Sequence, residues 1–205
     1  MLQQLLNLVA PIRCVLCAEL GSGICATCRR KTQGGRTRIG RTPVHVAGMS
    51  RDFVQVVVVW KDQRAKYLTS ALAELARSTL PQKASGVLVP IPARKSSLMA
   101  RGWSPLGDLA TALSACSHLE LDQELLQWQR QPFEQRNLSD TQRQANMRDA
   151  FVVTRKPTHS VWLLDDVMTS GATLRSAINA LEQCNIHVQG GIVLAAPRIG
   201  RNPQL

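Results

Sequence analysis

Three short apolar runs along the chain have the pattern of buried strands. They contain β-branched residues and are bounded by Gly, Pro or charged positions; they are Val87–Ile91, Val161–Leu164 and Gly191–Ala195. Short continuous apolar runs of this kind are typical of buried strands. The pattern therefore predicts three buried strands.

Between these runs, apolar residues recur at spacings of three and four, which gives one face of a helix an apolar stripe. The helices predicted in this way are Tyr67–Leu80, Pro105–Leu113 and Thr173–Gln183. Alternating strands and helices from about Val44 onward indicate an α/β domain. The segment Phe53–Trp60 is ambiguous, because four consecutive valines favour a strand while Ser50 followed by Asp52 resembles a helix start.

Composition excludes a disordered or fibrous protein and adds a basic surplus. Of 205 residues, 44% are hydrophobic and 19% are charged, which is typical of a folded chain. The net charge is +11, and residues 1–51 hold eight basic residues against one acid, so this quarter carries +7 of it. A polyanionic partner is one interpretation, and a solvated basic segment is the other.

The sequence predicts a cytoplasmic protein without a membrane span. A span needs ~20 apolar residues, whereas the longest candidate, Phe53–Trp60, has eight and includes Gln55. Residues 1–11 are apolar but have no basic residue ahead of their Leu and Val positions, unlike a secretory signal.

Four of the six cysteines form two C-x2-C pairs, at Cys14, Cys17, Cys25 and Cys28. Two such pairs complete the tetrahedral thiolate shell of a structural zinc ion. Disulfides are the weaker interpretation in a cytosolic chain, and a redox pair does not explain two motifs. We expect a zinc knuckle and then a linker over Lys31–Arg41, so that residues 1–43 form a zinc module with a basic linker and residues 44–205 form the α/β domain.

The most specific segment runs from Val161 to Arg175 in the order strand, two acids, small hydroxylated loop, helix. Free backbone N–H groups and the helix dipole favour a phosphate where such a helix begins. The loop residues expected to contact it are Thr169, Ser170, Gly171, Ala172 and Thr173. Asp165 and Asp166 follow at the carboxyl end of the strand, where they can accept hydrogen bonds from sugar hydroxyls or approach a hydrated divalent metal. An acidic helix cap is the alternative.

The residues Asp165–Thr173 resemble, without departure, the binding signature of type I phosphoribosyltransferases. In that family paired acids hold the ribose hydroxyls of phosphoribosyl pyrophosphate (PRPP), and the following loop holds its 5′-phosphate. Other segments narrow the resemblance to the ComF family, including its GntX-like members. They are the four-cysteine knuckle, Trp60-Lys61, Val89-Pro90-Ile91-Pro92, Arg101-Gly102-Trp103 and the pattern from Gln135 through Arg143 and Asn146 to Phe151. The chain departs from the family at Ser104 and Pro105.

The resemblance implies a type I phosphoribosyltransferase-like α/β fold, with a mainly parallel twisted sheet, flanking helices and a preceding zinc knuckle. It favours a helix over Arg51–Asp62. It also implies that pyrophosphate, bound to Mg²⁺, leaves the ribose while a nitrogen nucleophile arrives, with Asp165 and Asp166 in the catalytic site. Cations must neutralise the leaving group; the candidates are Arg101, also taken as catalytic, and Lys61, Arg94 and Lys95. A solvated basic loop is the alternative.

Two functions stay open. The first is a PRPP-dependent phosphoribosyltransferase with an unidentified acceptor. Arg143 and Asn146 either shape the acceptor pocket or cap a helix and pair with Asp140 or Asp149. The second, implied by the ComF resemblance, is a protein of DNA uptake or processing that binds single-stranded DNA and DNA-processing proteins and keeps the PRPP fold as a binding or regulatory module. Trp103 and Trp128 either stack on a base or pack in the core.

Overall fold

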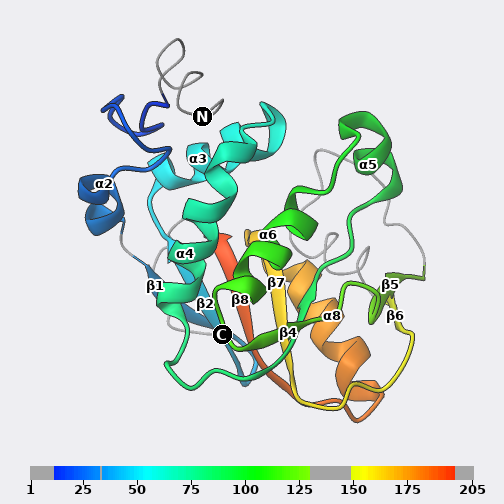
Figure 1. Cartoon of the computed structure of the whole chain (residues 1–205). Helices are drawn as coiled ribbons and strands as arrows, with labels where there is room; N and C mark the ends of the chain where they lie inside the picture. The colour runs from blue at the N-terminus through cyan, green and yellow to red at the C-terminus, as the bar shows by residue number, and fades with distance from the viewer. Residues whose placement is uncertain (1–11, 33, 130–148, 197–205) are drawn as a thin grey trace.

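A six-stranded sheet forms the centre of the computed structural model (Figure 1). The structure describes residues 12–32, 34–129 and 149–196. Its strands are β1 (Gly35–Ile39), β2 (Thr42–Gly48), β3 (Gly86–Pro90), β4 (Leu119–Leu121), β7 (Val161–Val167) and β8 (Val188–Ala195). They lie in the order β1-β2-β8-β7-β3-β4. β1 pairs antiparallel with β2, and all other neighbours are parallel. The predicted α/β class with a mainly parallel sheet is confirmed.

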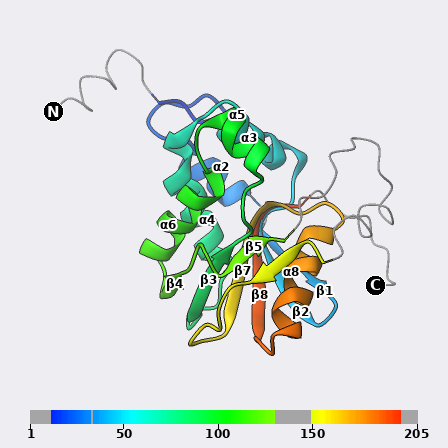
Figure 2. The same cartoon turned by 90° about the vertical axis from the view of Figure 1, so that its right-hand side faces the viewer.

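Helices cover both faces of the sheet (Figure 2). On one face α4 (Thr69–Thr79) packs beside α6 (Pro105–Ala115), and on the other α8 (Ala172–Gln183) lies against β7 and β8. The remaining helical elements are α2 (Ala26–Lys31), α3 (Arg51–Asp62), the 3₁₀ turn η1 (Lys66–Leu68) and α5 (Lys95–Arg101). The three predicted strands and the three predicted helices are all present, with ends shifted by a few residues.

The ambiguous valine-rich segment is a helix, as the resemblance favoured. Ser50 caps α3 by accepting a hydrogen bond from the N–H of Phe53 at 3.1 Å. The buried side chains of α3 are Phe53, Val56, Val57 and Trp60. They follow one another at spacings of three, one and three, so they share one face of a helix. Burial of that face outweighs the preference of valine for strands.

The prediction of a linker over Lys31–Arg41 is wrong for residues 35–39, which form β1. Ile39 is buried while Arg36 and Arg38 are exposed, which is the alternation of a half-buried edge strand. The hydrogen-bonded pairing with β2 stabilises a stretch that has little apolar surface of its own. A boundary at residue 43 falls inside β2.

A second, two-stranded antiparallel sheet pairs β5 (Leu126–Trp128) with β6 (Phe151–Val153). Trp128 packs against Phe151 with 4.3 Å between ring centroids. The indole N–H of Trp128 donates a hydrogen bond to the carbonyl of Pro92 at 2.8 Å. These contacts fix the Trp128 ring beside the loop that follows β3.

The cysteine-containing segment packs against the sheet domain. Ile24 belongs to the buried core. A Cβ atom at Gly23 would lie 2.5 Å from Leu68 Cδ2, so a side chain there would require the buried Leu68 to shift. Arg29 forms an ion pair with Glu74 on α4. Within the described residues, no helix has the length and apolar character needed to cross a bilayer.

Candidate functional site

The two acids Asp165 and Asp166 lie near the carboxyl end of β7 and line one cleft. Asp165 accepts a hydrogen bond from the N–H of Asp166 through Oδ1 at 2.8 Å, and Asp166 accepts one from the N–H of Val167 through Oδ1 at 2.7 Å. The second oxygen of Asp166 forms an ion pair with Lys61 from the end of α3. Although neighbouring strand residues usually face opposite sides, both carboxylates reach the same hollow.

This cleft has a volume of about 260 Å³ and brings together residues predicted from separate parts of the sequence. The predicted residues that line it are Lys61, Arg94, Arg101, Asp165, Asp166 and Thr173. Ile91, Pro92 and Trp128 add an apolar wall. Lys95 is exposed at the start of α5 and is not among the lining residues.

A smaller hollow of about 30 Å³ adjoins the cleft and is formed by the loop between β7 and α8. The predicted loop residues that line it are Thr169, Ser170, Gly171, Ala172 and Thr173. It shares Asp165, Val167 and Thr173 with the cleft. A helix N-terminus therefore faces a space next to the paired acids, which is the arrangement that binds an anion in many α/β proteins.

Gly171 determines the shape of this loop. It is the N-cap of α8 and has a left-handed backbone, with φ of 71°. A Cβ atom at this position would lie 3.2 Å from Cδ1 of Ile39 on β1. Glycine is thus favoured both by the backbone conformation and by the contact with β1.

Asp165 has an unusual protonation equilibrium. Desolvation by burial, together with the nearby charge of Asp166, raises its pKa to about 7, although the N–H of Asp166 and the charge of Lys61 act in the opposite direction. Near neutral pH the carboxyl is therefore partly protonated. Hydroxyl donors or a divalent cation in the cleft would favour its ionised form.

The cations of the cleft have partners from other elements. Arg101 Nη2 donates to Asp62 Oδ1 at 3.0 Å, and the guanidinium of Arg94 lies 5.9 Å from the ring centroid of Trp128, within the range of a cation–π contact. Sequence reasoning did not find Asp62, because a single acid in a helix carries no motif.

The two tryptophans differ in position. Trp103 packs edge-on against Trp60 with 6.3 Å between ring centroids, and Lys66 Nζ lies 4.8 Å from its ring. This is a packing role. Trp128 both packs against Phe151 and lines the cleft. Arg143 and Asn146, the candidates for the acceptor pocket, lie outside the described residues.

Ser104 and Pro105, where the chain departs from the family, also line the cleft. Ser104 caps α6 by accepting a hydrogen bond from the N–H of Gly107 at 3.1 Å, and Pro105 opens the helix. A Ser-Pro pair is a common helix start, so these two residues could have been placed from the sequence.

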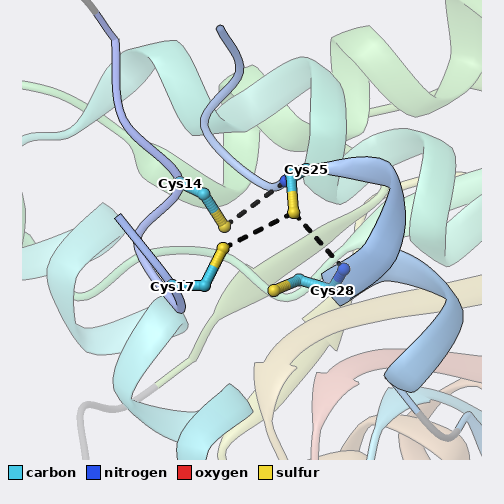
Figure 3. Close-up of side chains that lie close together, drawn as sticks. All are labelled: Cys14, Cys17, Cys25 and Cys28. Carbon is cyan, nitrogen blue, oxygen red and sulfur yellow. Dashed lines mark hydrogen bonds between the residues drawn. The ribbon is translucent and has the colours of Figure 1, made fainter. Parts of the chain in front are cut away.

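Four cysteines form a separate centre (Figure 3). The sulfurs of Cys14, Cys17, Cys25 and Cys28 all lie within 4.8 Å of one another. Backbone N–H groups donate to two of them at 3.4 Å, from Cys25 to Cys14 and from Cys28 to Cys25. These four residues come close enough to hold a metal ion such as zinc.

The thiols of this centre shift one another's pKa values in both directions. Burial tends to raise the pKa of Cys14, but N–H groups of Cys25, Leu16 and Cys17 outweigh it and lower the pKa to about 6. The neighbouring Cys17, with burial, raises the pKa of Cys28 to about 12. A divalent cation among the sulfurs would offset this repulsion and favour four thiolates.

No protein-family model matches the chain, and the comparison with curated proteins finds no match either. Membership of the ComF family therefore stays a hypothesis that depends on the quoted motifs.

Proposed function

We propose that the chain binds PRPP in the cleft at the carboxyl edge of the sheet and acts as a phosphoribosyltransferase on an unidentified nitrogen acceptor. One observation carries the proposal: paired acids, three cations and a helix N-terminal loop meet in two adjoining hollows. These are the chemical groups that a ribose with a phosphate at one end and a pyrophosphate at the other requires.

The proposed roles follow from position. The 5′-phosphate binds the loop from Thr169 to Thr173, whose amides lie at the start of α8. Asp165 and Asp166 accept hydrogen bonds from the ribose hydroxyls. Arg101 and Lys61 neutralise the pyrophosphate as its bond to C1 breaks and the bond to the acceptor nitrogen forms. The fold is then of the type I phosphoribosyltransferase kind.

Two metals belong to the proposal. Mg²⁺ enters with the pyrophosphate and adds positive charge to the leaving group, and the carboxylates of Asp165 and Asp166 are the hard oxygen donors nearest to it in the cleft. Zinc occupies the four-cysteine centre as a structural ion, because four thiolates leave no ligand position for catalysis.

Calorimetric titration of PRPP with Mg²⁺ into zinc-loaded protein tests the site. We expect binding by the wild type and its loss in the double variant Asp165→Asn/Asp166→Asn. The control Asp52→Asn/Asp108→Asn makes the same change of charge at exposed positions outside the cleft and should bind normally. Failure of the wild type to bind PRPP, or normal binding by the Asp165/Asp166 variant, would refute the proposal.

A second candidate function is nucleic-acid binding, proposed together with a role in DNA uptake or processing as in the family that the chain resembles. The observation in its favour is that Arg36 and Arg38 are exposed along edge strand β1, two residues apart and hence on one face. Binding of single-stranded DNA through these side chains should weaken steeply with salt. The variant Arg36→Gln/Arg38→Gln should bind less DNA than Lys83→Gln/Lys156→Gln, and equal binding by the two variants would argue against β1 as the interface.

A further inference from the structure

The last two residues of α3 each pair with a residue that lines the cleft. Lys61 forms an ion pair with Asp166 on β7, and Asp62 pairs with Arg101, the last residue of α5. Lys61 and Arg101 are two of the cations proposed to neutralise pyrophosphate, and both line the cleft. Each of these two cations is therefore paired with a carboxylate of the protein.

The stability of α3 does not explain an acid at this position. Asp62 is the last residue of the helix, where the negative end of the helix dipole disfavours a carboxylate. Its side chain is 53% exposed, while that of Arg101 is 28% exposed. Within the described part of the chain, this carboxylate accepts a hydrogen bond from Arg101, which lines the cleft.

A carboxylate bound to a guanidinium has the same recognition chemistry as a phosphate, since both offer anionic oxygens to the N–H groups of arginine. The pair of Asp62 and Arg101 joins single atoms, Oδ1 and Nη2, and its half-exposed carboxylate can return to water. Such a contact is weak enough to be exchanged for a ligand oxygen.

We propose that Asp62 limits the affinity of the cleft for pyrophosphate-bearing ligands, because it occupies Arg101 until the ligand displaces it. The proposal rests on the proposed function in assigning Arg101 to the pyrophosphate end of PRPP. Asp62 then lowers the affinity for ligands that carry pyrophosphate but not for a ribose phosphate without it. Such a ligand does not need Arg101 and leaves the ion pair of Asp62 and Arg101 intact.

The test is calorimetry on the full chain with two probes, PRPP with Mg²⁺ and ribose 5-phosphate. Breaking an exposed ion pair costs little, so Asp62→Asn should bind PRPP ~2–5-fold more tightly than the wild type. Its affinity for ribose 5-phosphate should change by less than about 2-fold. Asp52→Asn, the same change at an exposed position at the other end of α3, should alter neither affinity.

A double-variant cycle separates exchange at Arg101 from a general effect of charge. In an Arg101→Gln background, Asp62→Asn should no longer tighten PRPP binding. The inference is overturned if Asp62→Asn binds PRPP no more tightly than the wild type, or if it tightens both probes equally, or if the gain persists without Arg101. In each of these cases the wild type still binds PRPP, whereas absence of that binding removes the proposed function as well.

Discussion

Replacing Gly171 by alanine tests the geometry of the loop between β7 and α8, which is the proposed phosphate site. The substitution places a Cβ atom on a left-handed backbone with φ of 71°, at 3.2 Å from Ile39 Cδ1. The left-handed conformation costs an alanine about 1–2 kcal/mol. Displacing the Ile39 side chain from its rotamer adds about 1 kcal/mol.

The matched control is Gly40→Ala. Gly40 has φ of 59°, but a Cβ atom there would meet nothing within 4 Å. It therefore pays the backbone cost of about 1–2 kcal/mol alone. In a chain of this size each kcal/mol lowers Tm by about 2–4 °C. We expect Tm to fall by about 5–10 °C for Gly171→Ala and by about 3–6 °C for Gly40→Ala.

Thermal unfolding measured by circular dichroism gives both values, and PRPP titration gives the functional difference. Only Gly171→Ala should weaken PRPP binding, because only this residue belongs to the proposed phosphate loop. If Gly171→Ala matched the wild type in Tm, the left-handed N-cap and its contact with β1 would be wrong. If both variants lost PRPP binding equally, the effect would be one of general stability.

Three further predictions concern charge, metal and packing. Because the pKa of Asp165 is raised to about 7, the folded chain holds a proton there that the unfolded chain releases near pH 4, so the stability from this group is present at low pH and is lost as pH rises toward 7. The free energy of urea unfolding should therefore differ less between pH 5 and pH 8 in Asp165→Asn than in the wild type. An equal difference in the two proteins would contradict the raised pKa. Removing metal with a chelator, or changing Cys14 to serine, should lower Tm. Metal analysis should show that about one zinc ion per chain is lost in either case. A zinc-free chain with the Tm of the zinc-loaded protein would refute a structural ion. Trp128→Phe should lower the free energy of unfolding, measured in urea, by about 1 kcal/mol, because the hydrogen bond to Pro92 is lost while the ring contact with Phe151 remains. An unchanged free energy of unfolding would mean that this hydrogen bond does not stabilise the fold.

The elements that the sequence predicted are those with enough apolar surface to decide their own structure. Val161–Leu164 is buried throughout and forms part of β7. β1 was missed because its pairing with β2, rather than its composition, makes it a strand. β5 and β6 have three residues each, too few for either periodicity to appear.

The candidate site was predictable where its residues adjoin in sequence. Asp165–Thr173 forms one local structure, so its order of strand, acids, loop and helix could be read directly. The cleft itself depends on contacts between distant residues: Lys61 and Asp166 are 105 positions apart, and Asp62 and Arg101 are 39 apart. No local pattern encodes such pairs, so the contact of Asp62 with Arg101 is seen only in the folded structure.

The position of β1 has a consequence for dividing the chain. β1 covers the outer edge of β2, and its Ile39 lies against the position of Gly171. A shortened protein that began at Val44 would expose the unpaired N–H and C=O groups of β2, which favour self-association of sheets. It would also lose the wall behind the β7–α8 loop. Trimming the chain to residues 44–205 would therefore favour aggregation rather than yield an isolated sheet domain.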